Sequence, residues 1–328
     1  LLIVLIIFLL SSCKQIPPPN SPTLSSPVHF EALSLLKAEH SELDFGVSPH
    51  DGIRTIRDFA IRENGNLLLL ELSNKVHEYS PSGEWLGSYD YDFAGKGLTA
   101  YMLTCDKEEN LYFIDGHNSL IIKANRNEIL ATSSFGEKSI ITEPGLIKSM
   151  TALKENILLL TAISPHDYLT YTYELDVSKD DALCISQPRE GIVLGKGLSY
   201  KNELITQGEY GELTDGTLVT IYKNGIEKAK FEIHRANNFI FGLQIYGVNE
   251  NGDYLAKIFE YLADGNSLQE TLVILDNQGE IKSICQDQLK EDDIIRIYNG
   301  NSYVLRFNTD GIDVFPLQKL FATSQEGD

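Results

Sequence analysis

The stretch Ile56–Tyr89, IRDFAIRENGNLLLLELSNKVHEYSPSGEWLGSY, decides the fold of this chain. Short apolar runs alternate in it with clusters of turn-forming residues, which is typical of consecutive β-strands. The pair Asn64-Gly65 tolerates the positive φ of a tight hairpin between the first two runs. We therefore expect a four-stranded antiparallel meander. Its strands are Arg57–Arg62, Leu67–Leu72, Lys75–Tyr79 and Glu84–Tyr89.

Similar units follow along the rest of the chain. The triplet Asn66-Leu67-Leu68 is matched by Asn110-Leu111-Tyr112 and Asn156-Ile157-Leu158 at intervals of about 45 residues, within the range of β-propeller blades. The Asn-Gly turn returns at Asn251-Gly252. No stretch carries a sustained helical stripe of apolar residues. The sequence thus predicts an all-β fold, a six-bladed β-propeller of four-stranded antiparallel blades.

The later blades are less regular. Blade three is expected to have a strand around Tyr168–Leu175 and an outer strand near Ala182–Ser186. Blade four is expected to have strands at Leu198–Lys201, Glu203–Gln207, Leu218–Lys223 and Glu227–Ile233. Blade six shows only Ile294–Tyr298, Tyr303–Asn308 and Gly311–Leu317, so it is one strand short.

The segment Val28–Leu36 has strand character and no partner of its own. We expect it to add as the outermost strand of blade six. This pairing would close the ring between the two ends of the chain and hide an edge strand.

The first residues look like a leader. Leu1–Leu10, LLIVLIIFLL, is too short to span a bilayer of ~30 Å as a helix but suits the apolar core of a signal peptide. Leu10-Ser11-Ser12-Cys13 resembles the bacterial lipobox, in which the cysteine carries the lipid. The alternative is a signal peptide without lipidation and a chance cysteine. We expect residues 1–12 to be a signal peptide whose first residues precede this sequence, and Cys13 to be the lipidated residue.

Residues 13–27 are rich in Pro and Ser, which favours an extended, semi-rigid tether. Residues 28–328 would then form a single propeller domain. In Bacteroidetes lipoproteins an acidic cluster after the lipidated cysteine tends to accompany surface display, and its absence after Cys13 favours the periplasmic side. We expect an anchor in the outer membrane with the domain facing the periplasm. The membrane is thus the first predicted partner, reached through the N-terminal lipid.

The composition of the chain limits the classes of partner that can be expected besides the membrane. The chain has 328 residues, of which 42% are hydrophobic, and a net charge of −20. A surface this acidic repels phosphate backbones, so nucleic acid is not an expected partner. The three remaining cysteines, Cys105, Cys184 and Cys285, fall in three different blades, so we expect buried thiols rather than disulfides.

A lipobox, a Pro/Ser tether and the repeats ENGNLLLLE, KEENLYFID, KENILLL and NENGDYLAK together resemble the six-bladed β-propeller lipoproteins of Bacteroidetes, which are similar to NHL-repeat propellers. The segments AGKGL at residues 94–98 and LGKGL at residues 194–198 look like the Gly-rich segment that links blades in that family. The resemblance implies the fold and a place in the cell envelope. It implies no catalytic residue.

Two groups of polar residues are candidates for ligand binding. Lys96 and Lys196 sit between glycines and could lie on one face of the ring, although glycine at a crowded blade junction explains both segments as well. The second group belongs to turns between second and third strands or precedes inner strands, and good turn chemistry is its alternative explanation. It comprises Arg54, Asp115, His117, Lys148, His166 and Asp167.

No cofactor or metal is predicted, because calcium takes six to eight oxygens and the inner strands offer few acids. Zinc, phosphate-loop and nucleophile-elbow motifs are absent from the sequence. We expect a lipid-anchored module that binds a protein, small-molecule or glycan ligand, or serves as a scaffold. The alternatives are a hydrolase or lyase with its active site at the channel mouth, and a structural subunit of an envelope complex.

Overall fold

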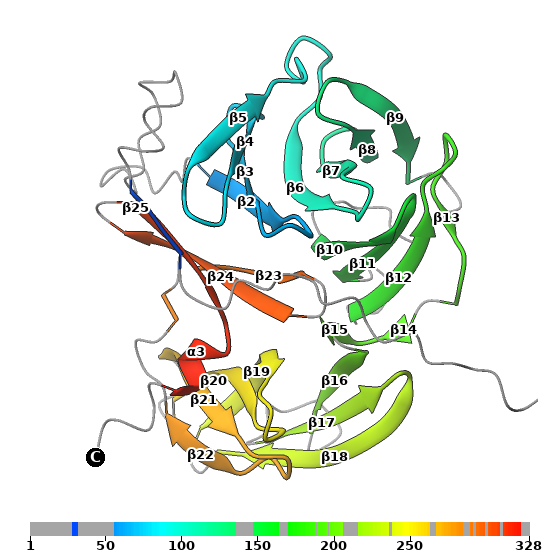
Figure 1. Cartoon of the computed structure of the whole chain (residues 1–328). Coiled ribbons are helices and arrows are strands. Elements are labelled where there is room, and N and C mark those ends of the chain that lie inside the picture. Colours follow the sequence, from blue (N-terminus) through cyan, green and yellow to red (C-terminus); the bar gives the residue numbers. More distant parts are fainter. Residues whose placement is uncertain are drawn as a thin grey trace, which may run out of the picture.

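The computed structural model describes residues 28–31, 56–135, 147–163, 170–187, 189–195, 197–205, 216–235, 238–262, 267–284, 289–290, 293–298, 301–308 and 311–322. Their strands form six antiparallel sheets arranged around a ring (Figure 1), which confirms the six-bladed propeller. Five sheets have four strands, and the sheet of blade three has five because its outer strand is broken in two.

Each blade is a meander that runs outward from the centre of the ring. Blade one contains β2 (Ile56–Ile61), β3 (Leu67–Glu71), β4 (Val76–Tyr79) and β5 (Trp85–Tyr89). Blade two contains β6 (Ala100–Cys105), β7 (Leu111–Asp115), β8 (Leu120–Ala124) and β9 (Ile129–Ser134). Blade three contains β10 (Ile147–Lys154), β11 (Ile157–Ile163), β12 (Thr170–Asp176), β13 (Leu183–Cys184) and β14 (Arg189–Glu190).

The other three blades follow the same order. Blade four contains β15 (Ile192–Gly195), β16 (Leu198–Leu204), β17 (Gly216–Lys223) and β18 (Ile226–His234). Blade five contains β19 (Phe239–Val248), β20 (Tyr254–Tyr261), β21 (Leu268–Leu275) and β22 (Ile281–Ile284). Blade six contains β23 (Ile294–Tyr298), β24 (Asn301–Asn308), β25 (Gly311–Pro316) and β1 (Val28–Glu31), and the short helix α3 (Lys319–Ala322) comes after β25.

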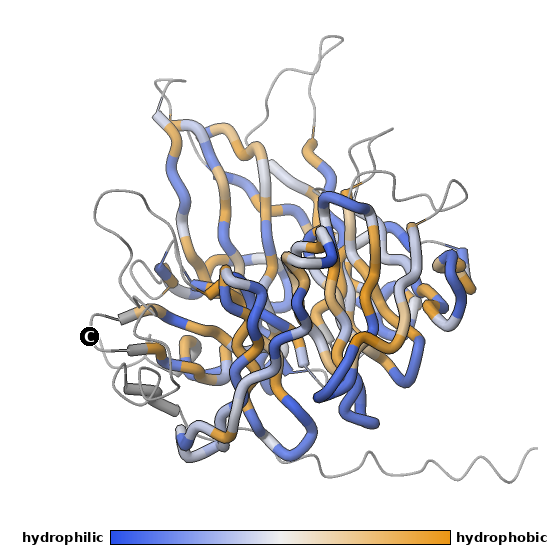
Figure 2. Tube along the Cα trace, turned by 90° about the horizontal axis from the view of Figure 1, so that it is seen from above, coloured by the Kyte–Doolittle hydropathy of each residue, from blue (hydrophilic) through white to orange (hydrophobic). Residues whose placement is uncertain are grey.

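Blade one forms as its sequence predicts. Gly65 has a φ of 86°, as the tight turn requires, and Ile61 pairs with Leu67 directly after it. Every residue of β3 is buried, whereas β5 alternates between half-buried and exposed residues. Neighbouring blades therefore cover both faces of the inner strands and leave the outer strand half in water. Figure 2 shows the same distribution, with apolar residues along the strands and polar residues in the turns.

Apolar clusters join the blades in groups. One cluster packs blades one, two and six together, and others join two with three, four with five, and five with six. The buried thiol of Cys105 belongs to the first cluster, and burial raises its pKa to about 12. The predicted buried free thiol is confirmed at this position. Cys184 is free but only half-buried, and Cys285 lies outside the described residues.

Blade four corrects the sequence prediction. Leu198–Lys201 and the start of Glu203–Gln207 belong to one strand, β16, because the polar residues 201–203 continue the pairing with β17. Cross-strand pairing thus overrides the turn preference of this polar run. The missing inner strand is β15, and the turn containing Gly195 and Gly197 joins β15 to β16. The segment LGKGL is therefore a hairpin within blade four and not a link between blades.

The N-terminal segment pairs with the last blade. Val28 is paired with Val314 and Glu31 with Gly311, so β1 is the outermost strand of blade six. That this pairing is what fastens the ring stays a prediction.

Candidate functional site

The loops that link consecutive blades lie on the same face of the ring as the turns between second and third strands. We call this the mouth face. Asp115 and His117 belong to a turn on this face, between β7 and β8, as the sequence predicts. The segment Ala94–Leu98 links β5 to β6 and lies there too, whereas the Gly195–Gly197 turn is at the opposite end of its strands. The two Gly-rich segments therefore do not occupy equivalent positions in the ring, and Lys196 itself lies outside the described residues.

Asp115 organises its own turn. Its carboxylate accepts hydrogen bonds from the backbone N–H groups of Thr99, His117 and Asn118 and from the side chain of Asn118. Burial acts to raise the pKa of this carboxyl, but the hydrogen bonds outweigh it and hold the pKa below its usual value. With its oxygens fully engaged and none of its surface exposed, Asp115 is a structural residue of the turn.

The other predicted residues differ in their placement. The exposed ring of His117 lies 2.8 Å from the hydroxyl of Tyr101, measured from Nε2. Lys96 donates its ammonium hydrogen to the carbonyl of Tyr91, at 2.5 Å. Lys148 is the second residue of the inner strand β10 and is exposed. The predicted residues that lie outside the described part of the chain are Cys13, Arg54, His166, Asp167 and Lys196.

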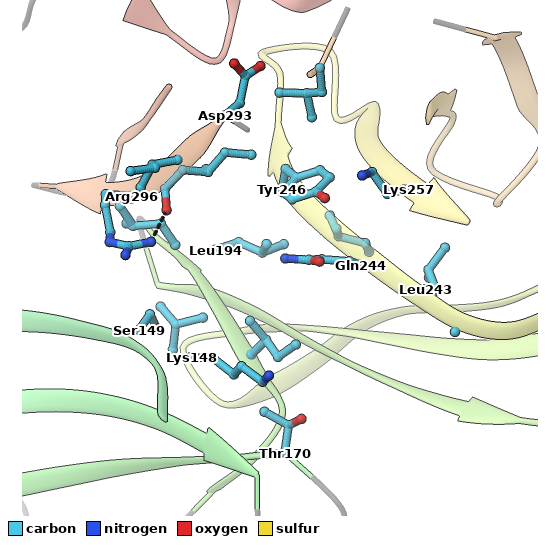
Figure 3. A pocket seen from close by; sticks show the side chains of 18 of the residues that line it. Lys148, Ser149, Thr170, Leu194, Leu243, Gln244, Tyr246, Lys257, Asp293 and Arg296 are labelled. Atoms are coloured by element: carbon cyan, nitrogen blue, oxygen red, sulfur yellow. Dashed lines mark hydrogen bonds between the residues drawn. The ribbon is translucent and has the colours of Figure 1, made fainter. Parts of the chain in front are cut away.

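A cavity of about 820 Å³ opens at the mouth face between blades three, four, five and six, and we call it the mouth cavity. Its described walls come mainly from the inner strands β10, β15, β19 and β23, with Arg57 from β2. The strands β11, β12, β16 and β20 and the segment before β23 add one to three residues each. Of the predicted residues described, Lys148 lines it, whereas Lys96, Asp115 and His117 do not. Figure 3 shows side chains from several of these strands around one space, among them Lys148, Gln244, Tyr246 and Arg296.

The described lining of the mouth cavity has a charge opposite to that of the whole chain. The whole chain has 47 acidic and 27 basic residues, excluding histidine. Among the described lining residues, one is acidic, Asp293, and five are basic. The basic ones are Arg57, Lys148, Lys257, Lys290 and Arg296.

Three of these six charges have strong partners. Arg296 is paired with the buried carboxylate of Asp58, with 2.6 Å between Nε and Oδ1. Lys257 is paired with Glu270 at 2.7 Å, and both oxygens of Asp293 accept hydrogen bonds from Arg306. Within the described part of the chain, no carboxylate pairs with Arg57, Lys148 or Lys290. The cavity therefore has positive charge that the described residues leave uncompensated.

Aromatic side chains form the wall on blade five. Phe241 lies with its ring centroid 4.9 Å from that of Tyr261 and 6.1 Å from that of Phe259. Phe241 and Phe259 line the cavity, as does Tyr246 further along β19. This wall forms because β19 is ten residues long, whereas β2, the inner strand of blade one, has six residues. The pairing of β19 with β20 extends as far as Phe239 and Tyr261.

A second cavity, of about 320 Å³, lies between blades three and four towards the opposite face. Turn residues such as Gly197 and Gly225 line it. It occurs where the described residues form no shared apolar cluster and where the outer strand of blade three is broken. Thr151, Val193 and Ile297 line both cavities, so the two cavities lie next to each other and share these three residues.

The sequence did not reveal most of the mouth cavity, because each inner strand contributes only a few of its residues. One signal could have found part of it. Arg57 and Lys148 are the second residues of their inner strands, and Arg296 is the third residue of β23. A cation at the start of an inner strand therefore marks the mouth of this channel.

In the part of the chain that the structure describes, no group of three or more His, Cys, Asp or Glu side chains could hold a metal ion. The described helix, α3, is far too short to cross a membrane, and no other described segment forms a spanning helix.

No protein-family model matches the chain, and no curated protein matches it. Solved structures of propellers do. Virginiamycin B lyase from Staphylococcus aureus matches with a TM-score of 0.40 and 10% identity, over 80% of this chain and 95% of that one. KlHsv2 with loop 6CD replaced by a Gly-Ser linker matches with a TM-score of 0.40 and 9% identity, over 80% and 97% of the two chains. The Dos1 propeller matches with a TM-score of 0.40 and 10% identity, over 80% and 77%. At such identities these likenesses concern the fold alone.

Proposed function

We propose that this chain is a binding module that takes a small molecule in the mouth cavity and is held by a lipid on Cys13 to the outer membrane, facing the periplasm. The mouth cavity is the observation that supports binding. Its volume of about 820 Å³ falls within the roughly 300–1,000 Å³ typical of small-molecule sites. Protein interiors are otherwise close-packed, so an open space of this size at the centre of a ring is a feature that function can use.

The composition of the walls also supports a ligand site. Such sites are mostly apolar, with a few polar groups that orient the ligand. Here Leu194 and Leu243 supply apolar surface, and Gln244 and Lys148 are exposed polar groups on the inner strands of blades five and three. The lipid anchor is supported by the sequence alone, through the lipobox and the tether that follows it.

A cavity-blocking variant tests the binding site. Gln244→Trp places a large ring in the cavity from an exposed position, so folding should be preserved. We expect some members of a library of neutral, anionic and cationic small molecules to raise the melting temperature of the wild type but not of this variant. Lys228→Trp, on the exposed outer strand β18, is the matched control and should respond like the wild type. Shifts that persist in Gln244→Trp, or a library without a single shift, would contradict the proposal.

Labelling with a radioactive fatty acid tests the anchor. The wild type should incorporate label, Cys13→Ala should not, and Cys184→Ser should be labelled like the wild type. Equal labelling of the wild type and Cys13→Ala would contradict the anchor and leave the binding site untouched.

A further inference from the structure

We propose that the ligand of the mouth cavity is an amphipathic anion, an acid group attached to an apolar body. This inference rests on the proposed function and adds the chemical class of the ligand. Two separate observations lead to it, one for the acid group and one for the body.

The acid group is inferred from three cations with which no carboxylate of the described residues pairs. Arg57, Lys148 and Lys290 reach the cavity from β2, from β10 and from the segment just before β23. The described carboxylates near them are occupied, since Asp58 pairs with Arg296 and Asp293 with Arg306. An anion that reaches these cations from within the cavity would gain charge-assisted hydrogen bonds that water does not fully replace.

Arg57 is held in place for this role. One of its guanidinium nitrogens donates to the carbonyl of Ala100 at 2.8 Å, and the group lies over the ring of Tyr101, 5.1 Å from the centroid. Arginine carries five N–H donors, so others remain for a ligand oxygen. A guanidinium that is already oriented loses less freedom on binding than a free lysine.

The apolar body is inferred from the opposite wall. Phe241 is 36% exposed although it packs on two other aromatic rings, so one face of this aromatic wall is open. Deeper in the cavity, Met150, Leu194 and Leu243 supply aliphatic surface. A ligand that covers these side chains gains free energy in proportion to the apolar area it removes from water. A small inorganic anion would leave this area wet.

The test measures binding of matched probes to the full-length mature chain by isothermal titration calorimetry. Octanoate and octyl phosphate carry both parts, octanamide lacks the charge, and acetate lacks the body. We expect octanoate to bind about tenfold more tightly than octanamide. Acetate should bind at least about a hundredfold more weakly than octanoate, because it buries no alkyl chain. Tighter binding of octyl phosphate than of octanoate would identify the acid group as a phosphate.

Variants connect the charge to named residues. Lys148→Met keeps the apolar stem and removes the charge, so octanoate should bind about tenfold more weakly while octanamide is unchanged. Lys290→Met is an independent second variant with the same expectation. Lys228→Met, on the exposed strand β18, is the control and should change neither probe. Melting temperatures of all three verify folding.

The outcomes separate the ligand class from the proposed function. Equal affinities for octanoate and octanamide, both lost in Gln244→Trp, would overturn the class and keep the cavity as a binding site. Octanoate binding that neither lysine variant weakens would also overturn it. If octanoate does not bind, the proposed ligand class is wrong. The library experiment with Gln244→Trp then shows separately whether the mouth cavity binds small molecules.

Discussion

Arg296 in blade six forms an ion pair with Asp58 in blade one, with 2.6 Å between Nε and Oδ1. Asp58 has no exposed surface, and its carboxylate also accepts backbone hydrogen bonds from Phe59 and from Leu103 in blade two. The pair thus joins the first and last blades of the ring. Because Arg296 also lines the mouth cavity, the same contact holds together the ring and one wall of the candidate site.

Asp58→Ala should destabilise the domain by about 3 kcal/mol, because removal of one partner leaves an uncompensated charge and unpaired backbone donors. Urea unfolding followed by tryptophan fluorescence measures this loss, since Trp85 lies in blade one. Glu232→Ala breaks an exposed contact with His234 and is the matched control, with little expected change. Equal stability of Asp58→Ala and the wild type would show that this ion pair does not hold the blades together.

Glu260 should make the stability depend on pH in the acid range. Both of its oxygens bind the guanidinium of Arg235 at 3.0 Å, and Asn238 and Thr271 donate to it as well. Burial acts to raise the pKa of Glu260, but these hydrogen bonds and the charge of Arg235 outweigh it and hold the pKa below its usual value. A lowered pKa in the folded state contributes stability above the unfolded value, and this contribution is lost as pH falls through the folded value.

Glu260→Gln is therefore expected to be less stable than the wild type at pH 7, with a difference that shrinks as the pH falls below about 4.5. Urea midpoints between pH 7 and pH 3 measure the difference. Parallel profiles of the two proteins would contradict the assignment.

Variants of Asp115 and His117 should distinguish an effect on stability from an effect on ligand affinity. Asp115→Ala removes a carboxylate that accepts several hydrogen bonds, so it should cost about 2 kcal/mol of stability without changing affinity at the mouth cavity. His117→Ala should change neither quantity by much. Calorimetric titration alongside urea unfolding checks both variants. A clear loss of affinity in a stable His117→Ala variant would show that His117 takes part in ligand binding.

Two truncations test closure of the ring by β1. A chain that starts at residue 28 keeps β1, whereas a chain that starts at residue 32 leaves the edge of β25 unpaired. We expect the longer chain to unfold like the full mature protein and the shorter one to be less stable and prone to aggregation, as exposed edge strands are. Equal behaviour in urea unfolding and light scattering would show that the ring closes without this strand.

The sequence predicts the parts of the fold that depend on neighbouring residues. Blade one is recognisable because the Asn64-Gly65 turn and the alternating strands lie within one short stretch. Blade four is harder, because the polar residues 201–203 look like a turn and only pairing with β17 shows that they continue a strand. The turn at Asp115 and the position of His117 in that turn can both be predicted from the neighbouring residues in the sequence.

The mouth cavity is lined by residues that are far apart in the sequence, so its position cannot be predicted from any single residue. Arg57, Lys148 and Arg296 are far apart in sequence and meet only after the ring has closed. Among the predicted residues that the structure describes, Lys148 is the one that lies in its wall. The hydrolase or lyase reading stays a prediction, as does the nature of any protein partner.

Thr151, Val193 and Ile297, which line both cavities, have a consequence for how a ligand would come and go. The size of these β-branched side chains limits the room between the mouth cavity and the second cavity. Trimming all three to alanine should enlarge that room and offer a ligand a second way out, towards the opposite face. We expect ligand release to become faster, in part because the mouth cavity itself loses apolar surface.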